Sequence, residues 1–169
     1  MSKDVCTEIV LIEGLGIDGD AHNGVYVQHL SRVKTNPTAP NLRQVHLIHA
    51  ELHDNLKTMN FTRGVNPGEM GENITTRGID LHALPTGTKL HLGNDGAVVQ
   101  LTGLRNPCRQ LEGLQQDLQK ACLETDQDGK ITKRKGGVMS IVLKGGVVRP
   151  NDQITVVLPE EPHQPLVCV

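Results

Sequence analysis

Cys108 is the residue whose position best suits it to chemistry. It follows an apolar run at 98–101 that predicts a strand, and two arginines, Arg105 and Arg109, flank it. Residues 109–124 have the spacing of an amphipathic helix, which would place Cys108 close to a helix N-terminus. Neighbouring cations and a helix dipole both favour the thiolate, the form that attacks electrophiles and binds soft metals. The alternative is that Cys108 is a small buried hydrophobic residue, as most free cysteines are.

A glycine-rich loop at 14–24 brings three more polar side chains together: Asp18, Asp20 and His22. Glycine at this density lets the backbone approach a ligand closely. The loop lacks a Lys-Ser/Thr pair and its acids would repel phosphate, so it does not read as a phosphate-binding loop. Without other support, the sequence favours a tight turn held by hydrogen bonds from the aspartate side chains.

A second glycine-rich stretch, at 66–81, carries Glu72 beside Asn73. A carboxylate next to a carboxamide offers both acceptors and donors, which suits them to the edge of a heterocycle. The same two side chains could equally cap and brace the loop. Both interpretations stay open.

Three histidines, His46, His49 and His53, lie in a predicted strand at 43–48 and a predicted helix at 50–59. His49 and His53 would share one helical face. A metal site would need a further acidic ligand that the spacing does not supply, so a solvated face is the favoured interpretation.

Short alternating segments dominate the rest of the chain. The clearest is a hairpin from 88–92 to 97–101 through Asn94, Asp95 and Gly96, and it delivers the chain to Cys108. In all, about eight short strands joined by glycine-rich turns accompany two convincing helices. This pattern predicts a mainly β fold: a mostly antiparallel, partly closed β-barrel with a few peripheral helices.

Composition limits the class of protein. The 169 residues include 17 basic and 19 acidic side chains, and the net charge of −2 gives no field for attracting nucleic acid or an anionic membrane. With Tyr26 and Phe61 as its aromatic residues, the chain lacks stacking platforms for single-stranded nucleic acid. No segment approaches the ~20 apolar residues of a membrane helix.

Four dispersed cysteines suit a reducing compartment, and we expect a cytoplasmic protein. Residues 1–158 are predicted to form one domain, followed by a tail of prolines and acids at 159–169.

Taken together, four blocks of the sequence resemble the molybdenum cofactor sulfurase C-terminal (MOSC) domain family, especially its small stand-alone bacterial members. The blocks are GIDGDAH at 16–22, PGEMGENITTRGIDL at 67–81, NPCRQL at 106–111 and GGVMSIVLKGGVVRPND at 136–152. They occur in the family's order. The resemblance implies a β-rich fold of barrel type, which agrees with the strand pattern.

The resemblance also implies that the Cys108 thiolate is a metal ligand. It would bind molybdenum in the pterin-based molybdenum cofactor (molybdopterin), or carry sulfur as a persulfide for delivery to that metal. Thiolate is a soft ligand suited to this centre, and flanking arginines would balance the cofactor's negative charge. The implied cofactor pocket contains further residues: Asp20, His22, Glu72, Asn73, Asn106, Arg109 and Arg134.

Side-chain chemistry assigns roles within that pocket. We expect Glu72 and Asn73 to form hydrogen bonds with the nitrogens and exocyclic amine of the pterin. Asn106 would brace the cysteine loop, Arg109 would pair with phosphate, and Arg134 would supply another basic contact. The chain departs from the family at Ala21, where an arginine is usual, and at Met139, where an aromatic residue is usual.

The implied activity is reduction of N-hydroxylated small molecules such as hydroxylamino-purines or amidoximes. An electron-donor reductase would be a separate partner, because the chain carries no flavin or haem motif. The alternative is a non-catalytic carrier of persulfide or cofactor, served by a sulfur-donor protein. A third interpretation, a domain whose pocket has decayed, is disfavoured by the presence of Cys108, Glu72 and Asn73. A homodimer is compatible with each of these functions.

Overall fold

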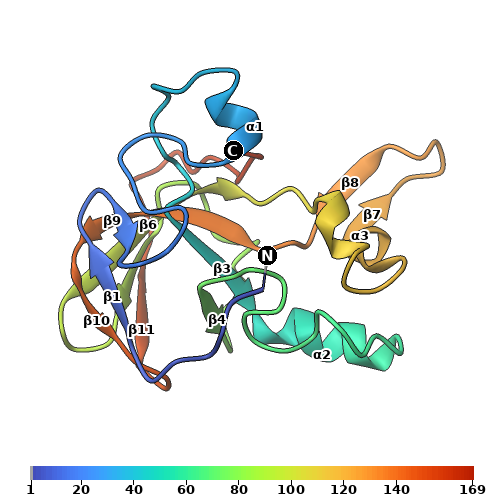
Figure 1. Cartoon of the computed structure of the whole chain (residues 1–169), viewed down its shortest axis with the longest axis horizontal. Helices are drawn as coiled ribbons and strands as arrows, with labels where there is room; N and C mark the ends of the chain where they lie inside the picture. The colour runs from blue at the N-terminus through green and yellow to red at the C-terminus, as the bar shows by residue number, and fades with distance from the viewer. Residues whose placement is uncertain (1) are drawn as a thin grey trace.

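The computed structural model describes residues 2–169 and shows a mainly β fold (Figure 1). Within these residues, the largest sheet has six strands in the order β11-β5-β6-β9-β3-β4. These strands are β3 (Val45–His49), β4 (Ile74–Thr76), β5 (Lys89–Leu92), β6 (Ala97–Leu104), β9 (Val138–Lys144) and β11 (Ile154–Val157). The pairs are antiparallel except for β3 with β4, which run parallel.

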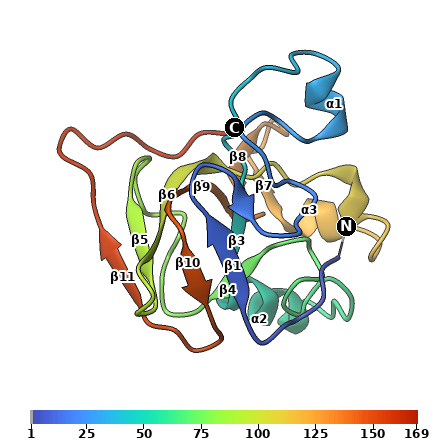
Figure 2. The same ribbon diagram turned by 60° about the vertical axis from the view of Figure 1, so that its left-hand side comes forward.

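The six-stranded sheet curls because its central strand is bent. The pairing of β6 with β9 shifts register between Val98 and Val99 and again between Leu101 and Gly103. Irregularities of this kind increase the local twist of a strand. A second sheet, in the order β10-β1-β2, wraps the same interior (Figure 2). Its strands are β1 (Ile9–Ile12), β2 (Gly16–Ile17) and β10 (Gly146–Val148). The predicted mostly antiparallel, partly closed barrel is confirmed.

The barrel interior is aliphatic, as expected for a chain with so few aromatic residues. Both sheets contribute to it, with Leu11 and Ile17 from the small sheet and Leu47, Leu90 and Val99 from the large one, all buried. A second apolar cluster lies outside the barrel, between the helix after β3 and the segment after Cys108. The two clusters hold the cysteine loop between them.

The helices are few and peripheral. The described residues contain α1 (Leu30–Val33), α2 (Ala50–Thr58), the 3-10 turn η1 (Arg109–Leu111) and α3 (Leu118–Ala121), and a small hairpin of β7 (Leu123–Thr125) and β8 (Ile131–Arg134) follows. The helix predicted at 50–59 is confirmed. None of the helices in residues 2–169 has the length and apolar character needed to cross a bilayer.

The prediction of one helix over 109–124 is wrong. The chain makes a single 3-10 turn and then adopts a left-handed conformation at Asp117, with φ of 63°. The carboxylate of Glu112 accepts the backbone N–H groups of Asp117 and Gln119, both at 2.9 Å, and so fixes the start of α3. Cys108 therefore precedes a three-residue turn, and a helix dipole does not act on its thiol.

The expected solvated histidine face is also wrong. His46 and His53 are 4% and 2% exposed. The His49 ring packs edge-on against the His82 ring, with centroids 5.1 Å apart. These histidines belong to the packed interior between β3, α2 and the neighbouring loops.

The last residues of the chain return to the body of the fold. The backbone N–H of Leu104 donates to Val167 O at 2.8 Å, and that of Thr86 donates to Gln164 O at 2.8 Å. The Leu166 side chain is buried in the barrel core. The segment at 159–169 thus packs along the end of β6, next to the cysteine loop.

Candidate functional site

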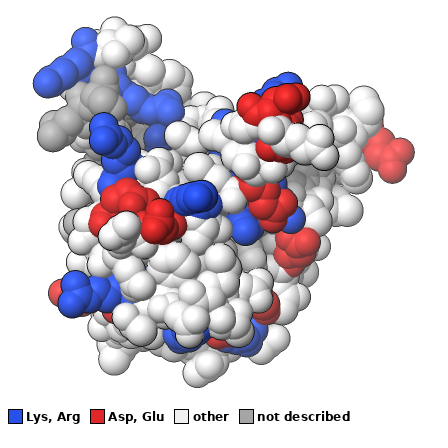
Figure 3. Space-filling view, turned by 90° about the vertical axis from the view of Figure 1, so that its right-hand side faces the viewer, with Lys and Arg blue, Asp and Glu red and all other residues white. Residues whose placement is uncertain are grey.

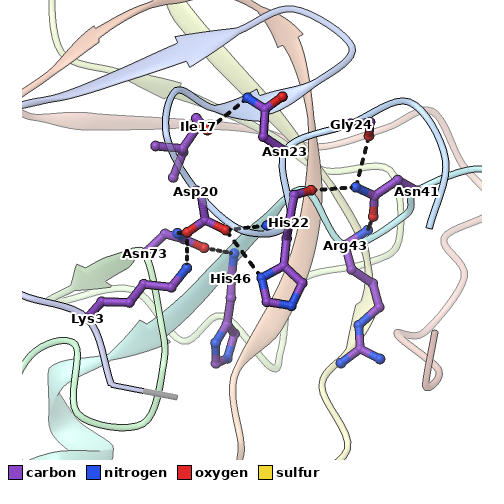
Figure 4. A network of polar contacts seen from close by, with 10 residues as sticks. All are labelled: Lys3, Ile17, Asp20, His22, Asn23, Gly24, Asn41, Arg43, His46 and Asn73. Atoms are coloured by element: carbon purple, nitrogen blue, oxygen red, sulfur yellow. Dashed lines mark hydrogen bonds and ion pairs between the residues drawn. The ribbon is translucent and has the colours of Figure 1, made fainter. Parts of the chain in front are cut away.

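Asp20 is the centre of a polar network that includes Lys3 of the N-terminal segment (Figure 4). Its carboxylate accepts the backbone N–H of His22 at 2.8 Å, in a tight aspartate turn, and lies 3.2 Å from His22 Nδ1. Lys3 forms an ion pair with the same carboxylate. Burial alone would raise the pKa of Asp20, but the hydrogen bonds from His22 and Lys3 outweigh it and hold this pKa far below its usual range. Asp20 is thus an ionised carboxylate whose position is fixed by hydrogen bonds.

Asn73 ties this network to the barrel wall. Its Nδ2 donates to Asp20 Oδ2 at 2.8 Å, and its Oδ1 accepts the backbone N–H of His46 at 2.9 Å. The backbone N–H of Asn73 donates in turn to His46 O at 2.8 Å. Both ends of the Asn73 amide are therefore engaged in holding the Asp20 loop against β3.

Glu72 is buried beside this network, with 2% of its surface exposed. Its Oε1 accepts the backbone N–H of Gly68 at 2.8 Å and lies 3.4 Å from His53 Nε2. Burial lowers the pKa of His53, although the Glu72 charge acts in the opposite direction. Glu72 Oε2 is buried and has no hydrogen-bond partner within residues 2–169. The carboxyl group thus retains an unused acceptor.

A cavity of about 820 Å³ opens between the two sheets and is lined by Asp20, His22, Glu72 and Asn73. The N-terminal segment forms one wall, anchored by a hydrogen bond from Lys3 N to Gly68 O at 2.9 Å. We refer to this space as the acidic cavity, because its wall contains six carboxylates and two cationic side chains: Asp4, Glu8, Asp18, Asp20, Glu72 and Asp152, with Lys3 and Arg149.

Cys108 lies in a loop with fixed backbone at the end of β6. Arg105 N donates to Gly137 O at 3.0 Å, and Arg134 Nε donates to Asn106 Oδ1 at 3.1 Å. Cys108 O accepts the backbone N–H of Leu111 at 3.0 Å, which closes the 3-10 turn. The Cys108 side chain is half-buried and not in a disulfide, and its thiol lies 3.8 Å from Gln110 Oε1. The loop therefore holds a reachable thiol at a defined position.

Cationic groups gather beside the thiol. Burial and the charges of Arg32 and Arg105 together lower the pKa of Arg43 to about 10, although Cys108 acts in the opposite direction. Burial lowers the pKa of His29, and the charge of Arg43 acts in the same direction. We name Arg32, Arg43, Arg105 and His29 the basic cluster. In Figure 3 blue side chains gather at the α1 end of the molecule, where Arg32 lies.

The structure separates the sequence-predicted site residues into two groups. Asp20, His22, Glu72 and Asn73 line the acidic cavity, whereas Asn106, Cys108 and exposed Arg109 form the cysteine loop. Arg134 braces Asn106 and lines a second, smaller cavity of about 420 Å³. Arg105 connects the two groups, because it is close enough to interact electrostatically with both Cys108 and Glu72.

Comparison with known proteins places this arrangement in a family. Residues 31–155 match the MOSC domain family model. The chain belongs to the MOSC domain family. None of the curated proteins matches it.

Solved structures show the same MOSC fold. YuaD from Bacillus subtilis is 23% identical, with a TM-score of 0.70, over 92% of this chain and 87% of that one. YiiM from Escherichia coli is 19% identical, with a TM-score of 0.60, over 95% of this chain and 67% of that one. YiiM from Geobacillus stearothermophilus is 27% identical, with a TM-score of 0.56, over 73% of this chain and 58% of that one.

Sequence reasoning missed most of the basic cluster of this MOSC domain. Arg43 precedes β3 and His29 precedes α1, far from Cys108 in the sequence, so local spacing does not connect them to it. Lys3 was missed for the same reason. One available signal was the run Asn41, Arg43, Gln44 and His46, which places polar residues at the start of a strand that is otherwise buried.

Proposed function

We propose that this MOSC domain binds the molybdenum cofactor through Cys108 and reduces N-hydroxylated small molecules, with electrons from a separate reductase. The observation that carries the proposal is the basic cluster beside a reachable thiol. Arg43 is half-buried and Arg105 is buried, and the like charges of Arg32 and Arg105 act on Arg43, which raises the free energy of its charged form. An anionic ligand at Cys108 would relieve that cost.

The residues present fit such a ligand. The cofactor carries a phosphate and dithiolene sulfurs, and arginine pairs well with groups of this kind. Cys108 would supply a soft thiolate ligand to the metal, and the basic cluster would face the anionic part. When bound, the cofactor would supply two-electron oxygen-atom chemistry. The chain's own contribution is to hold the thiol, to balance charge and to orient the substrate.

The first test is molybdenum content. Wild-type protein and Cys108→Ser are purified without oxygen from a host that makes the cofactor, and molybdenum per chain is measured by elemental analysis. We expect near-stoichiometric metal in the wild type and less than a tenth of that in Cys108→Ser. The control is Cys6→Ser, at a free cysteine that is exposed, with circular dichroism to verify folding. Equal molybdenum in Cys108→Ser and the wild type would contradict the proposal.

The persulfide-carrier function makes a different prediction for the same protein. Cys108 would then accept sulfur from a persulfide donor, and the mass of the wild-type chain would rise by one sulfur atom. Molybdenum would be absent from both the wild type and Cys108→Ser. The half-buried but reachable thiol is compatible with transfer of this kind. Reductase turnover with an amidoxime, lost in Cys108→Ser, would decide in favour of the enzyme.

A further inference from the structure

We infer that the acidic cavity is a binding site for an organic cation, an amidinium or ammonium group carried on an apolar body. As a statement about the substrate of the molybdenum centre this rests on the proposed function, but the binding itself does not. The size of the cavity, about 820 Å³, falls in the range of small-molecule sites.

The floor of the cavity is apolar and comes from both sheets. The side chains are Ile9, Ile17, Ile74, Leu92, Val148 and Ile154. They belong to, or pack against, the barrel core, so their positions are fixed before any ligand arrives. An apolar body resting on this floor would bury surface without requiring the barrel to rearrange.

The charge of the wall selects the sign of the ligand. Its two cationic side chains are already paired: Lys3 with Asp20, and Arg149 with Glu8 at 3.2 Å. Arg149 also contacts Asp95 at 2.7 Å. The remaining carboxylates leave the cavity with a negative field, which attracts a cation and repels an anion.

Glu72 gives this field a specific acceptor. Its side chain is 1% exposed, it lines the cavity, and Oε2 has no hydrogen-bond partner among the described residues. A buried acceptor without a donor costs free energy that a ligand N–H group would recover. The neighbouring His53 does not cancel the charge, because burial lowers its pKa and favours the neutral ring. Arg105 interacts electrostatically with both Glu72 and Cys108, so Glu72 is the cavity residue that connects it to the cysteine loop.

The second cavity of the molecule has the opposite character. Lys133, Arg134, His82 and His163 line it, and no carboxylate occurs among the described residues of its wall. We therefore expect a preference for a cation at the acidic cavity and not at this second cavity.

The experiment uses three probes of one shape and different charge: benzamidine, benzamide and benzoate. Their binding to the wild-type chain is measured by amide chemical-shift titration. We expect benzamidine to bind at least tenfold more tightly than benzoate, with benzamide between them. We expect the shifted resonances to come from the floor and wall of the acidic cavity, and binding to weaken as salt is raised.

Variants locate the effect. Asp4→Asn and Asp18→Asn should each weaken benzamidine binding several-fold, and Glu72→Gln should weaken it most. The matched control is Asp128→Asn, which removes one negative charge from the exposed hairpin between β7 and β8 and should change nothing. If Glu72→Gln fails to fold, Asp4→Asn and Asp18→Asn still decide the matter. Equal affinity for benzoate and benzamidine, or benzamidine binding that none of these variants changes, would overturn the inference.

Cys108→Ser separates this inference from the proposed function. It should bind benzamidine as the wild type does, because the thiol does not line the acidic cavity. Retained benzamidine binding in a protein that never holds molybdenum would support the cation site while refuting the proposed metal centre. Molybdenum binding with no preference among the three probes would do the reverse.

Discussion

At the scale of single residues, the half-buried His82 contributes to the response of stability to acid. Burial, with a smaller contribution from the charge of the neighbouring His49, lowers the pKa of His82 to about 4. The unfolded chain takes up this proton near pH 6.5, before the folded chain does, so stability falls as the pH drops from 6.5 to about 4. For this one group the loss is about 2–3 kcal/mol over that window. We expect His82→Phe to retain stability down to pH 4.5 better than the wild type, measured by urea unfolding at several pH values.

The replacement is feasible because His82 Nε2 is buried and has no hydrogen-bond partner within residues 2–169. Phe retains a ring against His49 and removes the proton-binding site. The control is His91→Phe, on the exposed face of β5, which should follow the wild-type pH profile. Identical pH slopes for His82→Phe and the wild type would mean that His82 is not the group responsible.

The candidate site was predictable at this scale only in part. Cys108, Asp20, Glu72 and Asn73 could be selected because glycine, proline and charge mark them within short segments. Their partners could not, since only the folded barrel brings Arg43 close enough to Cys108 for an electrostatic interaction. Side-chain type therefore suggested the chemistry, and tertiary contacts determined which residues take part.

At the scale of elements, the turn into β9 depends on a glycine. Gly137 has φ of +89°, and a Cβ there would overlap Leu47 O and lie 2.7 Å from Ile48 Cγ1 and 2.9 Å from His46 Nε2. Because those atoms belong to buried β3, they cannot move away. We expect Gly137→Ala to cost more than ~3 kcal/mol through strain and overlap together. Chemical unfolding measures this directly.

Gly129 is the matched control. It has φ of +77° in the hairpin between β7 and β8, but a Cβ there meets nothing within 4 Å. Gly129→Ala should therefore cost about 1 kcal/mol, from backbone strain alone. Equal costs at the two positions would show that close contact with β3 does not constrain Gly137.

The segment after Cys108 shows why elements are harder to predict than burial. Leu111, Leu114, Leu118 and Cys122 have helical spacing, and all four do pack into the second apolar cluster. The pattern was therefore right about which side chains are inside. It was wrong about the backbone, because Glu112 captures the N–H groups of Asp117 and Gln119 and stabilises a break that apolar periodicity does not report. The strands were easier to predict, because alternation of apolar and polar residues directly indicates a strand with one buried face.

At the scale of the whole molecule, the two ends of the chain flank the candidate site. The N-terminal segment forms a wall of the acidic cavity through Lys3. The C-terminal segment lies along the end of β6, where Leu104 forms a β-bridge with Cys168, four residues before Cys108. The sequence pattern predicted residues 159–169 as a tail that follows the domain, whereas the fold brings this segment back against the end of β6.

This arrangement predicts that the C-terminal segment supports the cysteine loop. Removing residues 166–169 deletes buried Leu166 and the backbone hydrogen bond from Leu104 to Val167 O. We therefore expect the free energy of unfolding to fall by about 3 kcal/mol and the melting temperature by about 6–12 °C.

Point variants separate the effect of packing from that of chain length. Leu166→Ala should cost about 2 kcal/mol, whereas Val167→Ala, at 63% exposed, should change stability by less than about 0.5 kcal/mol. Molybdenum content measured on the same proteins should fall with the deletion, because β6 no longer holds Cys108 at a fixed position. A deletion that leaves both the melting temperature and the molybdenum content unchanged would show that the cysteine loop is held by β9 and α3 alone.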